Sequence, residues 1–413
     1  MPRLPTSLLR RAASENPLLP LLLRQCRDLR SAQNELRWLQ EHAIERAQAQ
    51  THPSEYNGRV RIGYRTLLRD MVSQRTKGVP LQYILGTEHF GELELGVRRG
   101  VLIPRQETAS VTTHLAHLLS RSRFPLPPEL RILDLCTGSG CIPLLFQHEF
   151  RNSALRKNKN KDVKLKLLGV DISSTAIALA NSNLQHVMKE SRSLLGYPDN
   201  TGGGGDEISF LQADILPTPN SDTLSHPQNI PAPLLQSLDL LPTGHGRKWD
   251  ILISNPPYIS PKFFSSLTTE RSVRKWEPKL ALVPPKPKPA GSTVGKDTDD
   301  EQADLFYPVL LDLADRTGAK ICLFEVADLA QASRVVRLVR ERGTGLGRGW
   351  DRVEVWRDEP GLPSEPEEVM EREEKEKDEA SIETVGRGNG RAVVCWRGAG
   401  GLWLGKETNK ALD

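Results

Sequence analysis

Hydrophobic and polar residues follow two different periods in the N-terminal part of this chain. Between residues 18 and 78, apolar positions recur every three or four residues, as in Leu36, Leu39, Ala43 and Ala47. This spacing places apolar side chains on one face of a helix. The segment therefore predicts a small helical domain, which would either recognise a substrate or pack against the rest of the chain.

Residues 79–104 change to a period of two. Leu93, Leu95 and Val97 alternate with more polar neighbours, which is a strand pattern, and several glycines interrupt the segment. We expect a β-hairpin that links the helical domain to a second domain.

Short apolar runs then alternate with longer stretches of mixed character from residue 105 to residue 413. Five runs have the length of buried strands, at 131–135, 165–171, 208–213, 250–254 and 321–326. A later pair is predicted at 353–357 and 391–396. Strands that alternate with helices predict an α/β fold with a doubly wound, Rossmann-like sheet.

Polar segments separate several of these elements. They are rich in Lys and Asn, in Gly, in Pro and Ser, or in acidic residues, and lie at 152–164, 191–207, 216–247, 284–300 and 359–387. Such compositions bury little apolar surface, so we expect disordered or mobile insertions and assign them no function.

Composition narrows the class of protein. A net charge of +4 over 413 residues lacks the strongly basic balance of a dedicated nucleic-acid binder. The five cysteines form no C-x-x-C pair, so we predict neither a disulfide framework nor a metal site. No apolar run is long enough to cross a bilayer, and we expect no membrane partner.

The first 17 residues allow two interpretations. Arg3, Arg10 and Arg11 occur with no acidic residue before Glu15, as in organelle transit peptides. The alternative is an ordinary N-terminus that leads into a helix.

A cofactor site is predicted at the end of the first strand. Asp134 precedes the loop Cys136-Thr137-Gly138-Ser139-Gly140, whose glycines let the backbone turn tightly and approach a ligand. Asp171 ends the second strand, where it can accept hydrogen bonds from both ribose hydroxyls of an adenosine. The alternative role for Asp171 is to cap the following helix.

The third strand ends near Asp214 and Ile215. Asp214 can reach the exocyclic amine of an adenine, with Ile215 against the ring; the alternative is a loop aspartate without a ligand. A nicotinamide dinucleotide would also suit the glycine loop and Asp171. However, Pro143 stands where the dinucleotide motif has its third glycine.

The most specific motif follows the fourth strand, at Asn255-Pro256-Pro257-Tyr258. Two prolines fix two successive φ angles and make the turn stiff. The Asn255 side chain and the Pro256 carbonyl can then accept the two hydrogens of a planar –NH2 group, and Tyr258 can cover that group. An amide nitrogen is a poor nucleophile, so alignment and stabilisation of the charge that develops on nitrogen are the chemistry required.

Together these motifs resemble the HemK/PrmC family, the protein-(glutamine-N5) methyltransferases that modify peptide-chain release factors. The matching segments are PLQYILGTEHFG at 80–91, VLIPRQET at 101–108, LDLCTGSGCI at 133–142, GVDIS at 169–173, NPPY at 255–258, WEPKLAL at 276–282, FEVADLAQ at 324–331 and GRAVV at 390–394. NPPY alone also occurs in nucleic-acid methyltransferases, whereas its combination with the LIPR-x-ET segment and a helical N-terminal domain points to this family.

The resemblance implies S-adenosylmethionine as the methyl donor and a Gly-Gly-Gln glutamine as the substrate. It places five residues at the cofactor: Thr137, Gly138, Gly140, Asp171 and Asp214. It places Asn255, Pro256, Pro257 and Tyr258 around the glutamine, with Asn255 also next to the cofactor. The helical N-terminal domain and the Arg-bearing N-terminus favour a eukaryotic mitochondrial member over a cytoplasmic one.

The sequence departs from the family pattern at several positions. Cys136 replaces the first loop glycine, Gln106 and Ala109 replace residues of the R-P-E-T-E segment, and an insertion follows the EP-x-x-AL motif. None of these changes touches Asn255, so we expect an active enzyme. We also expect a monomer that has a release factor as its protein partner and no stable nucleic-acid partner. Two alternatives remain: an N-methyltransferase of nucleic-acid bases with the same NPPY chemistry, and a scaffold that binds the cofactor without catalysis.

Overall fold

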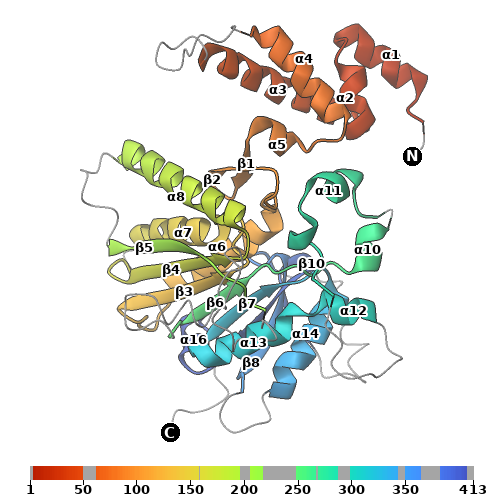
Figure 1. The fold of residues 1–413 in the computed structure, drawn as a ribbon. Coiled ribbons are helices and arrows are strands. Elements are labelled where there is room, and N and C mark those ends of the chain that lie inside the picture. The colour runs from red at the N-terminus through yellow and green to blue at the C-terminus, as the bar shows by residue number, and fades with distance from the viewer. Residues whose placement is uncertain are drawn as a thin grey trace, which may run out of the picture. The chain divides into compact units, whose positions relative to one another are not determined.

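A computed structural model describes residues 3–49, 62–157, 159–195, 205–216, 248–266, 268–286, 298–342, 349–363 and 382–406. The chain divides into two compact units (Figure 1). A helical unit contains residues 1–87, 97–99 and 267–277, and a sheet unit contains residues 88–96, 100–266 and 278–413. The segment 267–277, which was expected in the second domain, thus belongs to the helical unit.

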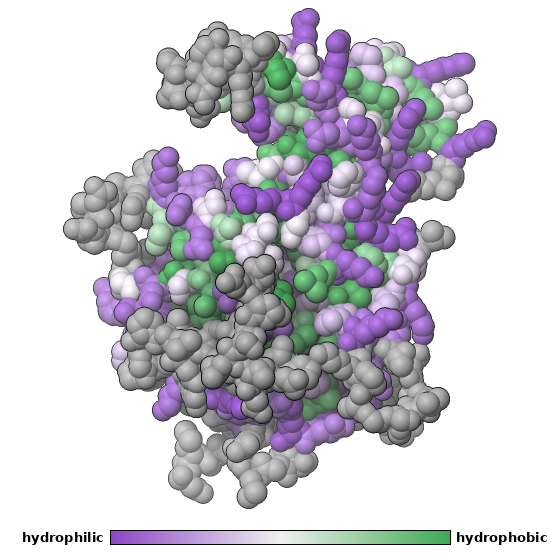
Figure 2. Space-filling model, viewed as in Figure 1, coloured by the Kyte–Doolittle hydropathy of each residue, from purple (hydrophilic) through white to green (hydrophobic). Residues whose placement is uncertain are grey.

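Short and medium-length helices build the helical unit. They are α1 (Thr6–Glu15), α2 (Leu19–Cys26), α3 (Leu29–Ala49), α4 (Tyr64–Thr76), α5 (Leu81–Leu85) and α11 (Arg271–Trp276). Leu36, Leu39 and Ala43, which gave the helical period, are buried in one apolar core. Ala12 of α1 is also fully buried there, so the packed helices begin before the predicted boundary at residue 18. Figure 2 shows hydrophilic side chains over much of the visible face of this unit.

The sheet unit contains one mixed sheet. Its strands are β3 (Glu129–Leu135), β4 (Lys164–Asp171), β5 (Glu207–Gln212), β6 (Ile251–Ser254), β7 (Ile321–Glu325), β8 (Arg352–Glu359), β9 (Thr384–Val385) and β10 (Arg387–Trp396). They lie in the order β5-β4-β3-β6-β7-β10-β8-β9. Strands β3 to β7 pair in parallel, and β10 pairs antiparallel with both β7 and β8. The predicted α/β class and its five parallel strands, β3 to β7, are confirmed.

Helices cover both faces of the sheet (Figure 1). They are α6 (Gln106–Ser120), α7 (Cys141–Lys157), α8 (Ser174–Leu195), α10 (Pro261–Ser265), α12 (Thr298–Ala303), α13 (Phe306–Thr317), α14 (Leu329–Arg342) and α16 (Ala399–Trp403), with a 3-10 turn at Lys279–Ala281. Side chains of α6 and α7 share one apolar core with the sheet, and side chains of α13 and α14 share the other. In the described residues no helix is long and apolar enough to cross a membrane.

The predicted hairpin forms between β1 (Thr87–Phe90) and β2 (Leu93–Gly96). Phe90, Leu93 and Leu95 are buried in the core of the sheet unit. Asn183 of α8 holds the end of β2, because its side chain accepts from Gly96 N at 2.9 Å and donates to Gly96 O at 3.2 Å.

The predicted insertions need correction at their edges. Helix α7 continues to Lys157, within the predicted insertion at 152–164, because Ser153 and Ala154 are buried against the sheet unit. Similarly, α8 continues to Leu195, α12 begins at Thr298, and β9 lies within 359–387. The interiors of four predicted insertions, at 196–204, 217–247, 287–297 and 364–381, lie outside the described residues.

Candidate cofactor and substrate site

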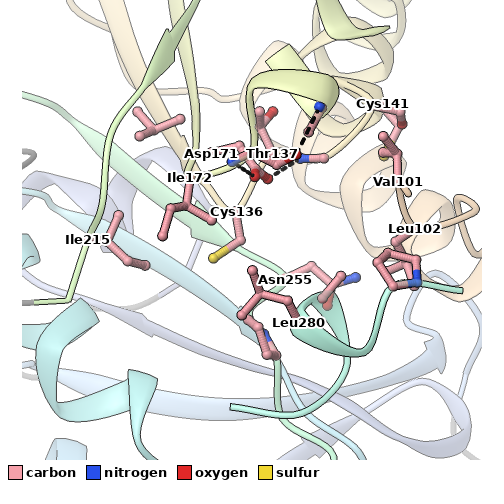
Figure 3. Close-up of a pocket in the computed structure, with 18 of the residues that line it drawn as sticks. Val101, Leu102, Cys136, Thr137, Cys141, Asp171, Ile172, Ile215, Asn255 and Leu280 are labelled. Carbon is pink, nitrogen blue, oxygen red and sulfur yellow. Dashed lines mark hydrogen bonds between the residues drawn. The ribbon is translucent and has the colours of Figure 1, made fainter. Parts of the chain in front are cut away.

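A cavity of about 370 Å³ opens at the carboxyl ends of the parallel strands. Its wall includes the loop after β3, residues 171–173 after β4, residues 213–216 after β5 and Asn255 after β6. Parallel strands place these four loops at one edge of the sheet, which is where doubly wound folds bind ligands. In Figure 3, Asp171 and Thr137 lie at one end of the view, Asn255 and Leu280 lie at the other, and Cys136 lies between them.

The loop after β3 is fixed by main-chain hydrogen bonds. Thr137 N donates to Val170 O at 2.9 Å, which ties the loop to β4. Gly138 has φ +56° and Cys136 has φ +63°, so both adopt the left-handed conformation that favours glycine. The loop therefore keeps the shape that a glycine would give, although Cys136 carries a side chain there.

Asp171 holds this loop directly. Its carboxylate accepts from Gly138 N at 2.9 Å and from Ser173 N at 2.9 Å (Figure 3). Ser173, rather than Asp171, receives the hydrogen bond typical of a helix cap, from Ala176 N at 3.3 Å. Burial raises the pKa of Asp171, and the backbone N–H groups of Ser173, Gly138 and Ile172 partly oppose that shift. A carboxylate has about four acceptor positions, so these N–H groups leave at least one for a ligand.

Asp134 and Gly140, both predicted at the cofactor, are not part of the cavity wall. Asp134 is 1% exposed, and its burial raises the pKa of the carboxyl to about 8. Side chains alternate along a strand, so Asp134 shares the covered face of Ile132, under α6 and α7. Gly140 has a packing role, because an added Cβ would lie 2.7 Å from the Phe210 ring.

Asp214 and Ile215, which the sequence analysis places against an adenine, both line the cavity. Asp214 Oδ1 accepts from Leu216 N at 2.9 Å, which fixes the turn after β5. Ile172 and Ile215 give this side of the cavity an apolar surface that suits a flat ring.

Three contacts fix the loop that carries Asn255. The Ser254 hydroxyl donates to Leu135 O at 2.8 Å and ties β6 to β3. Beyond the prolines, Ile259 N donates to Leu282 O at 2.8 Å, and Gln331 Nε2 donates to Tyr258 O at 3.2 Å. Asn255 and Pro257 line the cavity, whereas Pro256 and Tyr258 do not.

A buried carboxylate lies behind this loop. Glu325, at the end of β7, is 2% exposed and accepts from two hydroxyls. Thr108 Oγ1 donates to its Oε2 at 2.6 Å, and the Tyr258 hydroxyl donates to its Oε1 at 3.1 Å. The Asn255 Nδ2 in turn donates to Thr108 Oγ1 at 3.4 Å.

Sequence reasoning gave Thr108 and Glu325 no role, although both stand in segments that carry the family resemblance. It also missed Gly169, where an added Cβ would lie 2.5 Å from the Thr137 hydroxyl. Only a glycine in β4 leaves room for that side chain. No group of three or more His, Cys, Asp or Glu that could hold a metal comes together among the described residues.

A glycine-bearing loop after the first strand, an acid after the second and an NPPY turn after the fourth, around one cavity, define a class I methyltransferase dependent on S-adenosylmethionine. The chain is 32% identical over 286 residues to Mitochondrial MRF1 N(5)-glutamine methyltransferase MTQ1 of Saccharomyces cerevisiae, a match that covers 68% of each protein. It is 33% identical over 195 residues to the release factor glutamine methyltransferase of Haemophilus influenzae, which covers 47% of this chain and 51% of that protein. The chain belongs to this HemK/PrmC family.

No family model matches the chain. Among solved structures, the N-terminal domain of human METTL16 aligns over 88% of this chain and 92% of its own, with 13% identity and a TM-score of 0.40.

Proposed function

We propose that this protein transfers a methyl group from S-adenosylmethionine to the side-chain amide nitrogen of the glutamine in the Gly-Gly-Gln motif of a peptide-chain release factor, and so supports translation termination. One observation carries the proposal: Asn255, on its rigid NPPY turn, faces the same cavity as Gly138 and Asp171. Relatives at about 30% identity are named as glutamine methyltransferases of release factors.

The cavity suits the cofactor in size and chemistry. Asp171 is half-buried and can accept from ribose hydroxyls, while Asp214 and Ile215 can bind an adenine. The main chain at Thr137 and Gly138 forms the adjoining wall, and an added Cβ on Gly138 would meet only open space. When bound, S-adenosylmethionine supplies a methyl group that its positive sulfonium already activates.

The substrate end then has two tasks, to orient the glutamine amide and to stabilise charge on its nitrogen. The Asn255 Oδ1 and the Pro256 carbonyl would accept the two amide hydrogens, and this localises the nitrogen lone pair. Preorganised acceptors of this kind commonly contribute about 10²–10³-fold to a rate. Tyr258 is proposed to border the amide, with its hydroxyl anchored on Glu325.

We further propose that the partner is a mitochondrial release factor and that the enzyme acts in mitochondria. The yeast relative is named as a mitochondrial enzyme that acts on MRF1. The Arg-bearing N-terminus is compatible with this location, although Ala12 packs into the helical core.

The test is methyl transfer in vitro. The purified protein is mixed with labelled S-adenosylmethionine and a mitochondrial release factor, or with the same factor carrying alanine for the Gly-Gly-Gln glutamine. Mass spectrometry should find one added methyl on that glutamine and none on the alanine variant. Transfer to tRNA, rRNA or DNA instead, with the release factor unmodified, would replace this proposal with the nucleic-acid alternative.

A further inference from the structure

Asn255 can act only if its amide points the correct way. Its Oδ1 must face the cavity to accept a substrate hydrogen, whereas its Nδ2 would repel the donor –NH2 of a glutamine. The two ends of an amide have almost the same shape, so packing alone does not select between them. A hydrogen-bond partner with a defined direction has to make the selection.

Thr108 provides that direction only because of Glu325. A hydroxyl has one hydrogen and can either donate or accept at a given neighbour. The Thr108 hydrogen is committed to Glu325 Oε2 at 2.6 Å, so the oxygen of Thr108 is left with lone pairs for Asn255. The Asn255 Nδ2 occupies that position, at 3.4 Å, and this leaves Oδ1 for the cavity.

Glu325 has the surroundings of an ionised carboxylate. Both of its oxygens accept from hydroxyls, one from Thr108 and one from Tyr258, and an ionised carboxylate is an acceptor only. Burial and the nearby charge of Glu107 raise the pKa of Glu325 above its ordinary value, while the Thr108 hydroxyl, the positive charge of Arg391 and the Tyr258 hydroxyl limit that rise. A buried charge is retained where such partners compensate for it.

We propose that Glu325 and Thr108 are positioning residues: the Glu325 carboxylate fixes the direction of the Thr108 hydroxyl, which fixes the Asn255 amide with its oxygen toward the substrate. The proposal rests on the proposed function and adds a relay from β7 through α6 to the NPPY turn. The same carboxylate also accepts a hydrogen bond from the Tyr258 hydroxyl. One buried charge therefore orients both polar side chains of the NPPY motif.

The structure offers matched variants. Thr108→Val removes the hydroxyl and keeps the shape, and Thr108→Ser restores the hydroxyl. Thr112→Val makes the same change one turn along α6, where the hydroxyl only bonds to Thr108 O at 2.7 Å. Glu325→Gln is matched by Glu354→Gln, because Glu354 is 0% exposed and bonds to Lys406 and Trp356, away from the cavity wall.

Methyl transfer to the release factor is measured under saturating cofactor, and cofactor affinity is measured separately by calorimetry. Thr108→Val and Glu325→Gln should each lower kcat by about 10²-fold, the cost of a misplaced catalytic group. Cofactor Kd should stay within about threefold, and Thr108→Ser should recover most of the rate. If Thr108→Val and Glu325→Gln keep the kcat of Thr112→Val and Glu354→Gln, the relay is wrong.

A second readout needs no substrate. In protein labelled with ¹⁵N-asparagine, the Asn255 side-chain signal is assigned by its loss in Asn255→Ala. Its two amide protons should be distinct and protected from exchange in the wild type and in Thr112→Val, and this protection should be lost in Thr108→Val and Glu325→Gln. A wild type that methylates no release factor would defeat the proposed function, and these spectra would still decide the relay: unchanged protection in all variants would overturn it.

Discussion

The two ends of the cavity are built in different ways. The proposed cofactor end, around Asp171, consists of main chain and short loops held by one carboxylate, since Asp171 binds the N–H groups of Gly138 and Ser173. The proposed substrate end, around Asn255, depends on side chains from distant segments, since the Thr108–Glu325 bond spans 217 positions in the sequence. The first end should therefore tolerate side-chain changes that the second does not, and its variants should affect affinity more than rate.

Asn255→Ala should have the largest effect and should fall almost entirely on the rate. Loss of the amide removes one preorganised acceptor, so kcat for methyl transfer should drop by about 10²–10³-fold. Calorimetry should show cofactor Kd within about threefold of the wild type, because the loops after β3 and β4 do not rest on Asn255.

This variant also distinguishes an enzyme from a scaffold that only binds the cofactor. A full rate in Asn255→Ala would remove the substrate end from the mechanism. A parallel loss of cofactor binding would mean that the two ends are not separate.

Asp171→Asn should give the opposite result, a loss of affinity. One carboxylate oxygen becomes an –NH2 group, which must face the N–H of Gly138 or Ser173 as a second donor. We expect cofactor Kd to rise by about 10–100-fold, in line with an unsatisfied buried donor. Asp206→Asn is the control, because Asp206 binds Arg151 and does not line the cavity. Equal Kd values for the two variants would contradict the assignment of Asp171.

The difference between the two ends also explains how far the sequence could predict the structure. Buried parallel strands such as β6 and β7 appear as continuous apolar runs, and the edge strand β5 as a partly apolar one, so β3 to β7 were predicted to within about two residues. Residues at the ends of such strands meet at one edge, which placed Asp171, Asp214 and Asn255 together. The order of the strands was therefore sufficient to predict that these three residues share one cavity.

The substrate end depends on information that strand order does not contain. No local pattern shows that the hydroxyl of Thr108 on α6 meets the carboxylate of Glu325 on β7. The motif likewise did not show which face of β3 Asp134 occupies, and in the structure this residue lies outside the cavity wall. Both the Thr108–Glu325 contact and the position of Asp134 depend on how helices pack against the sheet, and the sequence motifs do not show this packing.

Asp134, which lies outside the cavity wall, gives a pH dependence of the stability of the sheet unit. Its pKa is about 8 in the folded chain, against an ordinary value of 3.8. Between these values the folded protein holds a proton that the unfolded chain has lost, so the free energy of unfolding should fall as pH rises, by up to about 1.4 kcal/mol per pH unit. Asp134→Asn cannot ionise, and its advantage over the wild type should grow from pH 5 to about pH 8 and then level off. Denaturant unfolding without cofactor measures this, and parallel pH curves would show that Asp134 does not titrate as described.

Substitutions at Cys136 should have the smallest effect. They test whether the backbone alone shapes the proposed cofactor end. At φ +63°, a side chain costs about 1–2 kcal/mol relative to glycine, offset in part by the greater freedom of glycine in the unfolded chain. Cys136→Gly and Cys136→Ala both lose the thiol, so their difference isolates the backbone; the glycine variant should be more stable by about 0.5–1 kcal/mol in urea unfolding. At Cys141, the first residue of α7, the same pair of substitutions should make the alanine variant the more stable one.

Both Cys136 variants should keep cofactor Kd within about threefold of the wild type, because Thr137 and Gly138 contribute through their main chain. A large loss of affinity in Cys136→Gly would show instead that the thiol is part of the site, and the contrast between a backbone end and a side-chain end would not hold.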